Sequence, residues 1–151
     1  DGSPVMTKRI FGVVNRYDLS KEFPAVTIRP IPMKTLFAEI DWIYIMQSNN
    51  INDLRGGIWD SWADSTRSIG KAYGAQVAKP VFGYDNQMDY ILEELKKNPT
   101  SRRLVIELWN VSELDEMNLP PCCHHIQVVQ KNGKLNLCPQ LVDIVENVKP
   151  S

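Results

Sequence analysis

Residues 119–138 read LPPCCHHIQVVQKNGKLNLC, and this stretch contains the pattern that decides the local fold. The segments Cys123 to Gln130 and Lys134 to Cys138 are short and apolar enough to be strands. Between them stands Asn132-Gly133, a favoured pair for a two-residue turn between antiparallel strands. The stretch therefore predicts a β-hairpin.

Four segments further out carry secondary-structure signals. Ile10 to Leu19 is rich in β-branched and aromatic residues, which favours a strand. Met33 to Gln47 has the length of a helix and is apolar all round, the pattern of a buried helix. Asp85 is placed to cap a second helix that ends near Lys97. Arg103 to Trp109 is short and apolar, which is typical of a buried strand.

Because strands and helices alternate along the chain, the predicted class is α+β (mixed α/β). The chain has 151 residues, which fits one domain of ordinary size. No internal repeat or linker-like change in composition divides it. We therefore expect residues 1–151 to form a single domain.

The composition is that of an ordinary globular protein, with 43% hydrophobic residues, 23% charged residues and a net charge of −1. It excludes a wholly disordered chain and gives no basic surface for DNA. No apolar run approaches the ~20 residues that span a bilayer, so no membrane partner is expected. The three cysteines are odd in number and form no CxxC pair, which favours a reducing, cytoplasmic setting.

Four consecutive Cys and His residues, Cys122 to His125, raise the possibility of a metal site or a nucleophile. In an extended segment neighbouring side chains point to opposite faces, so these four cannot close the tetrahedron that zinc prefers, and we expect no metal. A thiol that follows the rigid Pro120-Pro121 pair is held in place, and with a lowered pKa it is a strong nucleophile. The alternative is that Cys122 packs as a small hydrophobic residue.

Glu39 lies in the apolar helix, and its neighbours three, four and seven positions away are Leu36, Trp42, Ile43 and Met46. Burial raises the pKa of a carboxyl group and suits it to general acid–base catalysis. The alternative is a glutamate at the edge of the helix, paired with a Lys or Arg.

Two other groups have both a functional and a structural interpretation. Ser101-Arg102-Arg103 offers two guanidinium groups and a hydroxyl, which suit a phosphate dianion but also suit a solvated strand entry. Trp59 and Trp62, with the glycine-flanked turn around Tyr73, suit either a stacking platform for a planar ligand or a hydrophobic core.

Taken in order, these motifs resemble the thymidylate synthase family from about Asp1 to Leu137. The resemblance rests on short motifs whose order and spacing agree with the family: Phe11-Gly12, Arg16-Tyr17-Asp18-Leu19, Phe23-Pro24, Glu39-Ile40-Asp41-Trp42, Ile58-Trp59-Asp60, Tyr73-Gly74, Gln76, Asn98-Pro99, Ser101-Arg102-Arg103, Trp109-Asn110, Leu119-Pro120-Pro121-Cys122, Gln127 and Gly133-Lys134-Leu135. It implies the family fold, a mixed sheet with packed helices.

The resemblance also implies a reaction, the reductive methylation of dUMP to dTMP. In this family a cysteine thiolate adds to C6 of the uracil ring, and 5,10-methylenetetrahydrofolate, the co-substrate, gives C5 a one-carbon unit and then hydride. By position Cys122 is the nucleophile and Glu39 is the acid–base carboxyl that works through water near O4. Tyr73 helps to remove the proton from C5.

The binding roles follow from the same resemblance. Gln127 would lie in the nucleotide pocket, with Ile58 and Trp59 against the folate. Arg102 and Arg103 match a pair that reaches across a homodimer interface to the nucleotide phosphate of the partner subunit.

The sequence departs from the family pattern in its last part and next to the nucleophile. Cys123 stands where the family commonly has His. From Cys138 onward the expected Gln-Arg-Ser motif is missing, although Asp143 matches the substrate-binding Asp that follows it. Pro139 does not suit a central strand. We therefore expect a divergent tail over 138–151 and a truncated chain, whose sheet and nucleotide pocket are incomplete at the C-terminus.

Three other functions stay open. The related pyrimidine nucleotide hydroxymethylases share the nucleophile and the folate but transfer the carbon to water. A non-catalytic remnant would keep only the fold and the dimer surface. An unrelated Cys–His hydrolase would use His124 or His125 as its base, but the sequence offers no separated third member.

Overall fold

The computed structural model describes residues 11–25, 27, 28 and 30–142 of the chain. Its internal contacts separate two units, of which one comprises Met33–Val142 and the other Asp1–Pro32 with Asp143–Ser151. Every helix and strand given below belongs to Met33–Val142.

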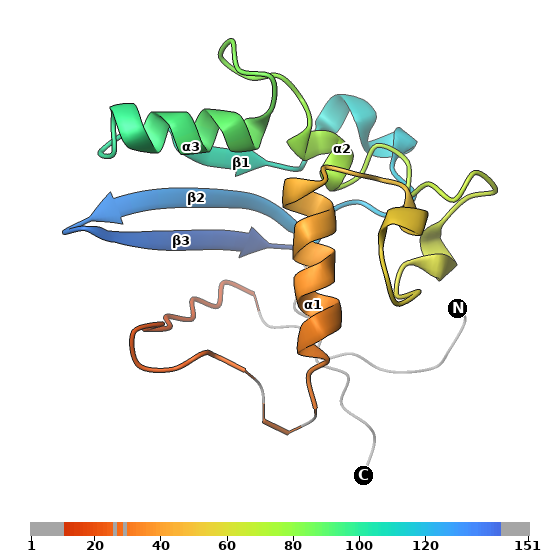
Figure 1. Cartoon of the computed structure of the whole chain (residues 1–151), viewed down its shortest axis with the longest axis horizontal. Helices are drawn as coiled ribbons and strands as arrows, with labels where there is room; N and C mark the ends of the chain where they lie inside the picture. Colours follow the sequence, from red (N-terminus) through yellow and green to blue (C-terminus); the bar gives the residue numbers. More distant parts are fainter. Residues whose placement is uncertain (1–10, 26, 29, 143–151) are drawn as a thin grey trace. The chain divides into compact units, whose positions relative to one another are not determined.

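A three-stranded sheet in the order β1-β2-β3 forms one layer of this unit (Figure 1). Its strands are β1 (Val105–Glu107), β2 (Cys123–Lys131) and β3 (Lys134–Leu141). Both pairings are antiparallel. The α+β class is thus confirmed, and the described sheet is antiparallel throughout. For β2 and β3 this follows from the two-residue turn, which joins antiparallel neighbours.

The predicted hairpin is confirmed, with Lys131 paired to Lys134 across the turn. Asn132 has φ 53° and Gly133 has φ 74°, the two positive values that a type I′ turn requires. β3 is longer than predicted and includes Pro139, opposite Ile126. The proline is tolerated because β3 is an edge strand of the described sheet, where a missing N–H breaks no second ladder.

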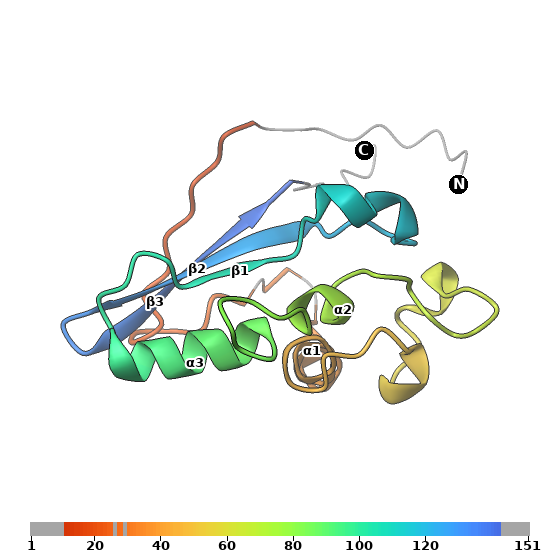
Figure 2. The same ribbon diagram turned by 90° about the horizontal axis from the view of Figure 1, so that it is seen from above.

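Three helices, α1 (Met33–Ile40), α2 (Gly74–Val77) and α3 (Gln87–Lys97), lie on the same side of the sheet (Figure 2). α1 continues into a π-helical turn, Asp41–Ile45. Short 3₁₀ turns occupy Ile51–Asp53, Asp60–Trp62 and Val111–Glu116. Between the layers lies the core, whose fully buried members include Trp42, Ile69, Val77, Leu104 and Leu108. No helix among the described residues is both long and apolar enough to cross a bilayer.

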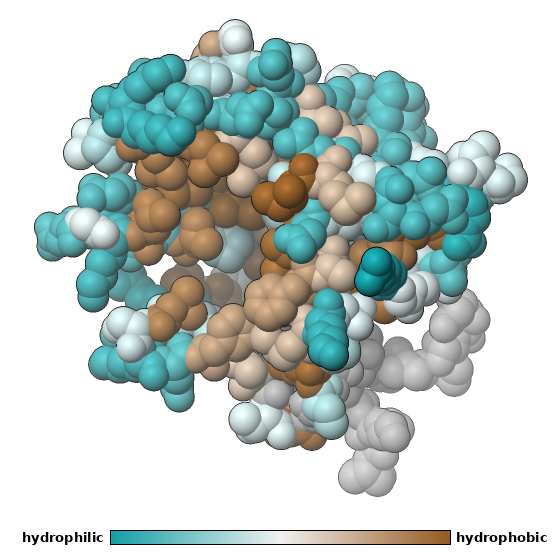
Figure 3. Space-filling view, viewed as in Figure 1, coloured by the Kyte–Doolittle hydropathy of each residue, from teal (hydrophilic) through white to brown (hydrophobic). Residues whose placement is uncertain are grey.

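The prediction that the helix from Met33 to Gln47 is buried on all sides is wrong. α1 itself has no buried residue, and only Trp42 and Ile43 of the π-helical turn are buried. α2 packs against that turn and covers one side of it. Apolar side chains that stay exposed on the others are Phe37, Ile40, Ile45 and Met46. Figure 3 shows hydrophobic residues on the surface over α1.

Two further predictions need correction. α3 is capped by Asn86, whose side chain accepts a hydrogen bond from the Asp89 N–H, and not by Asp85. Asn86 has the extended backbone of a cap residue, one position later than predicted. No strand forms between residues 11 and 19, the described part of the first predicted strand. A strand needs a neighbour for its N–H groups, and none pairs with this segment among the described residues.

Candidate active site

Cys122 lies at a bend just before β2, after the buried Pro121. Its N–H donates to the Tyr73 Oη at 3.1 Å, and its carbonyl accepts from the Val142 N–H at 3.0 Å. Its thiol is free and half-buried. The structure therefore holds this residue by its backbone and leaves the side chain available.

Tyr73 joins the Cys122 bend to the interior. Its φ of 44° and ψ of −100° are a strained combination for a residue with a side chain. Its carbonyl starts α2 by accepting from the N–H groups of Gln76 and Val77. Burial raises the pKa of Tyr73 to about 12, against the opposing effect of the hydrogen bond from the Cys122 N–H. The hydroxyl therefore stays protonated at neutral pH.

Glu39 accepts a hydrogen bond from the Trp59 Nε1 at 2.7 Å. Among the described residues no Lys or Arg forms an ion pair with Glu39. Its partner is therefore a tryptophan and not the Lys or Arg that the alternative interpretation of the sequence expected. Trp59 is 8% exposed, and its ring lies 5.2 Å from that of Tyr73, centroid to centroid. The structure thus brings together Glu39, Trp59, Tyr73 and Cys122 from four separate segments.

Tyr44 belongs to the same cluster, although the sequence indicated only an apolar position on the helix. Its pKa is raised, first by burial and then by the charges of Cys123, Tyr73 and Glu39. The only available signal was a hydroxyl in an otherwise apolar stripe. The π-helical turn positions this side chain, since it alters the spacing that a regular helix would give.

A polar network around Glu113, also missed from the sequence, fixes the turn that carries Tyr73. The buried Gln76 donates from Nε2 to the Lys71 carbonyl at 2.7 Å and to the Glu113 Oε2 at 2.9 Å. Lys79 and Lys71 pair with the same carboxylate at 2.5 and 3.2 Å. The hydrogen bond from Gln76 and then the lysines lower the pKa of Glu113 to about 2.

The two histidines after the cysteines have partners of their own. His125 Nδ1 lies 2.9 Å from the Glu107 Oε2, and the His124 ring lies against Trp109. No hydrogen bond joins either ring to Cys122 among the described residues. Nor does any group of three His, Cys, Asp or Glu residues in that part of the chain have the arrangement to hold a metal ion. A Cys–His hydrolase therefore gains no support from these contacts.

The predicted phosphate and nucleotide residues lie on the β1 side of the fold. Arg102 and Arg103 are exposed, and neither forms an ion pair within the described residues. Gln127, on β2, donates from Nε2 to the Arg102 carbonyl at 3.2 Å. No hydrogen bond or ion pair joins these three to Cys122 among the described residues, and Asp143 lies outside that part of the chain. Ile58, one of the predicted folate residues, is 41% exposed.

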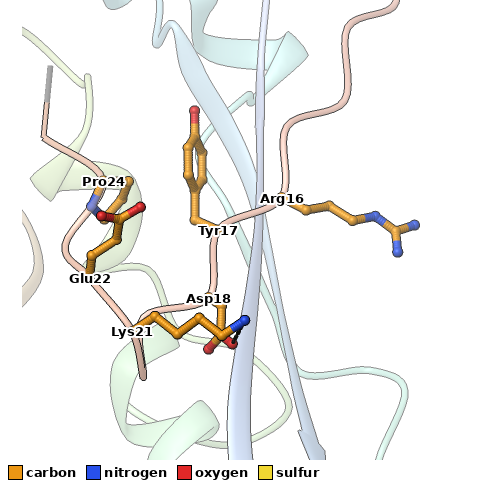
Figure 4. A pocket seen from close by; sticks show the side chains of 6 residues that line it. All are labelled: Arg16, Tyr17, Asp18, Lys21, Glu22 and Pro24. Atoms are coloured by element: carbon orange, nitrogen blue, oxygen red, sulfur yellow. Dashed lines mark ion pairs between the residues drawn. The ribbon is translucent and has the colours of Figure 1, made fainter.

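A separate pocket of about 110 Å³ lies in the N-terminal segment, lined by Arg16, Tyr17, Asp18, Lys21, Glu22 and Pro24 (Figure 4). Lys21 and Asp18 form an ion pair of 3.7 Å at its edge. Ligand pockets usually measure about 300–1,000 Å³. This pocket is too small for a nucleotide and is not the candidate site.

Comparison with known proteins settles the family. A family model described as thymidylate synthase matches residues 1–141. The chain belongs to the thymidylate synthase family. Thymidylate synthase of Fusobacterium nucleatum is 40% identical over 98% of this chain and 58% of its own length. Thymidylate synthase 1 of Bacillus subtilis is 40% identical over 91% of this chain and 51% of its own.

Solved thymidylate synthases confirm the expected fold. Thermostable thymidylate synthase A from Bacillus subtilis superposes with a TM-score of 0.70 and 41% identity, over 75% of this chain and 43% of that one. The thymidylate synthase of T4 phage gives a TM-score of 0.72 and 33% identity, over 80% and 48%. The chain spans about half the length of the curated relatives it matches.

Proposed function

We propose that this chain supplies the nucleophile and its neighbours to a thymidylate synthase active site that converts dUMP to dTMP. One observation carries the proposal. Cys122, Tyr73, Trp59 and Glu39 form a continuous series of contacts, through the Cys122 N–H to Tyr73, the Tyr73 ring to Trp59, and the Trp59 Nε1 to Glu39. These are residues to which the family resemblance gives catalytic and folate-binding roles.

In the proposed reaction the Cys122 thiolate adds to C6 of the uracil ring, which makes C5 nucleophilic. Tyr73 receives a hydrogen bond from the Cys122 backbone and keeps its own proton, so its O–H is free to take part in proton movement at C5. Glu39, fixed by Trp59, exchanges a proton through water near O4. The folate co-substrate supplies the one-carbon unit and the hydride.

Binding of the two substrates is assigned to the remaining predicted residues. Ile58 offers an exposed surface for the folate, and the next residue, Trp59, is buried. Gln127 and Asp143 are assigned to the nucleotide. Arg102 and Arg103, exposed and without acid partners among the described residues, are assigned to the nucleotide phosphate of a partner subunit in a homodimer. The free cysteines favour the cytoplasm as the place of reaction.

The experiment is to incubate the chain with 5-fluoro-dUMP and methylenetetrahydrofolate and to search for a covalent ternary adduct by mass spectrometry. We expect an adduct at Cys122 that disappears in Cys122→Ala and persists in the matched variant Cys138→Ala. A folded sample without adduct would contradict the proposal and favour the non-catalytic remnant. Adduct formation from the nucleotide alone, with no effect of folate, would also contradict it.

The assignment of Arg102 and Arg103 has its own test. The double variant R102A/R103A and the variant Cys122→Ala should each fail to form the adduct. Mixed dimers of the two should recover it, because one of their sites combines an intact cysteine with the intact arginines of the partner. No recovery in verified mixed dimers would show that the arginines serve their own subunit or no phosphate at all.

A further inference from the structure

Cys122 and Cys123 are two adjacent free thiols, and both are half-buried. Cys122 contacts Tyr73 through its backbone, while the charge of Cys123 acts on Tyr44. The second cysteine therefore lies near enough to Tyr44 for its charge to contribute to the raised pKa of that hydroxyl. No role in the proposed reaction accounts for a thiol at this position.

The backbone is irregular at this pair of residues. Cys122 lies at a bend outside β2, and the register between β2 and β3 shifts between Cys123 and His125. Consecutive Cα atoms across a trans peptide are about 3.8 Å apart, less than the roughly 4.4–6.8 Å of ordinary disulfides. A bond between adjacent cysteines thus needs a local backbone twist. A bend beside a register shift is where such a twist disturbs few ladder hydrogen bonds.

The third cysteine is out of reach of both. Cys123 pairs with Leu141, whereas Cys138 lies three residues away along β3, opposite Gln127. Three residues of a strand span roughly 10 Å, which exceeds the Cα separation that a disulfide bridges. Cys138 is also exposed, so it serves as an internal control for general thiol reactivity.

We propose that Cys122 and Cys123 form a reversible oxidation site for peroxides, in which the product is a disulfide between the two neighbours. The Cys122 thiolate attacks hydrogen peroxide, forms an S–O bond and releases hydroxide as the O–O bond breaks. The Cys123 sulfur then attacks the sulfenic sulfur, its thiol proton passes to the departing oxygen, and water leaves. The two sulfurs together lose two electrons, and the peroxide is reduced to one hydroxide and one water. The hydroxide becomes a second water when it takes up the proton that the Cys122 thiol gave to solvent.

The order of the two steps follows from the surroundings of Cys123. Burial, together with the charge of Cys122, raises the pKa of the Cys123 thiol. Cys123 is therefore the protonated partner, and a thiol reacts with peroxide far more slowly than a thiolate does. The strain of a bond between neighbours makes it easy to reduce, so a dithiol reductant restores both thiols.

The site has a consequence that rests on the proposed function. A disulfide at Cys122 removes the nucleophile, so the oxidised chain cannot add to the uracil ring. At the same time it protects the cysteine from irreversible oxidation to sulfinic acid. Formation of the disulfide itself depends only on the two thiols and does not require that the chain be catalytic.

The experiment is to treat the folded chain with hydrogen peroxide, block the remaining thiols with N-ethylmaleimide and map the peptides by mass spectrometry. We expect the peptide that contains Cys122 and Cys123 to lose two hydrogens and to bind no maleimide, and dithiothreitol to reverse both changes. Gain of two oxygens at Cys122, or a disulfide that involves Cys138, would overturn the proposal. Adduct formation with 5-fluoro-dUMP is measured separately, so a chain that oxidises as expected yet forms no adduct refutes the function alone.

Two replacements of Cys123 and one control test whether the second thiol is needed for reversible oxidation of Cys122. Cys123→Ser and Cys123→His remove the second thiol, and the histidine restores the residue common in the family. In either variant that keeps the native circular dichroism spectrum, peroxide should drive Cys122 to sulfinic acid, which dithiothreitol cannot reverse. Cys138→Ser should behave as the parent. Full recovery of Cys122 by dithiothreitol in both Cys123 variants would show that no neighbouring thiol is needed.

Discussion

The turn that carries Tyr73 and the edge strand β3 are held in very different ways. In the turn, Tyr73, Gly74, Gln76 and Val77 are all buried. The Gln76 side chain donates to the Lys71 carbonyl and to the Glu113 carboxylate. In β3 all eight residues are exposed, and within the described residues the strand pairs only with β2. One region is fixed from several segments and the other from a single neighbour.

This difference shows which part of the candidate site resists local opening. Local opening starts where few buried contacts oppose it, which in this fold is β3. Tyr73 belongs to the firm region, whereas Cys122 lies at the boundary, bonded to Tyr73 on one side and to Val142 on the other. The backbone of Cys122 thus depends on both the interior turn and the end of the hairpin.

The largest expected change in the free energy of unfolding comes from adding one methyl group to each region. A Cβ on Gly74 would lie 2.2 Å from the Ser48 carbonyl oxygen, which is backbone and cannot swing aside. Gly74→Ala should therefore lower the free energy of unfolding by about 3 kcal/mol in urea denaturation. Gly133→Ala, in the open hairpin turn at φ +74°, should cost about 1 kcal/mol from backbone strain alone. Equal losses of unfolding free energy in the two variants would show that the Tyr73 turn is no more tightly packed than the hairpin.

A smaller effect is expected from removing one amide in each region. Gln76→Leu leaves the Lys71 carbonyl and the Glu113 carboxylate without the Gln76 donor, and should cost about 2 kcal/mol. Gln140→Leu, on exposed β3, should change the free energy of unfolding by less than about 0.5 kcal/mol. Urea denaturation at neutral pH measures both. If Gln76→Leu were as mild as Gln140→Leu, the network around Glu113 would not be what holds the turn.

The smallest and most specific effect is a change in the response to acid. The pKa of Glu113 is lowered from 4.5 to about 2, so its carboxylate stabilises the fold above pH 4.5 and this contribution is lost as the pH falls toward 2. In Glu113→Gln the free energy of unfolding should fall less between pH 7 and pH 3 than in the parent. Glu116→Gln, which removes the other carboxylate partner of Lys71, is the matched control, and the acid response should weaken more in Glu113→Gln than in this variant. A parental slope in Glu113→Gln would contradict the role of the network.

Prediction from the sequence was accurate where structure depends on neighbours in the chain. The Asn132-Gly133 turn set the hairpin because its residues adopt positive φ at low cost, and the helix from Gln87 to Lys97 ends where expected. The helix that begins at Met33 was also found, but its burial was not. Burial depends on which elements pack against it, and the helix pattern alone does not show them.

For the candidate site too, local sequence predicted some features and contacts between distant segments decided the others. The order and spacing of motifs predicted roles for Cys122, Tyr73 and Glu39, because a motif marks residue types at fixed intervals. The hydrogen bond from Trp59 to Glu39, the approach of Tyr44 and the bonds from Gln76 and Lys79 to Glu113 join segments far apart in the chain. No local pattern encodes these contacts.

The hairpin, the α+β class and the family followed from the sequence alone. Each of these depends on backbone preferences or on residue order, which are properties of short stretches. The contact of the strained Tyr73 with Cys122 and the hydrogen bonds between Gln76 and Glu113 became visible in the tertiary structure alone. These features arise when side chains from distant segments leave water together, and their energies depend on the contacts they then make.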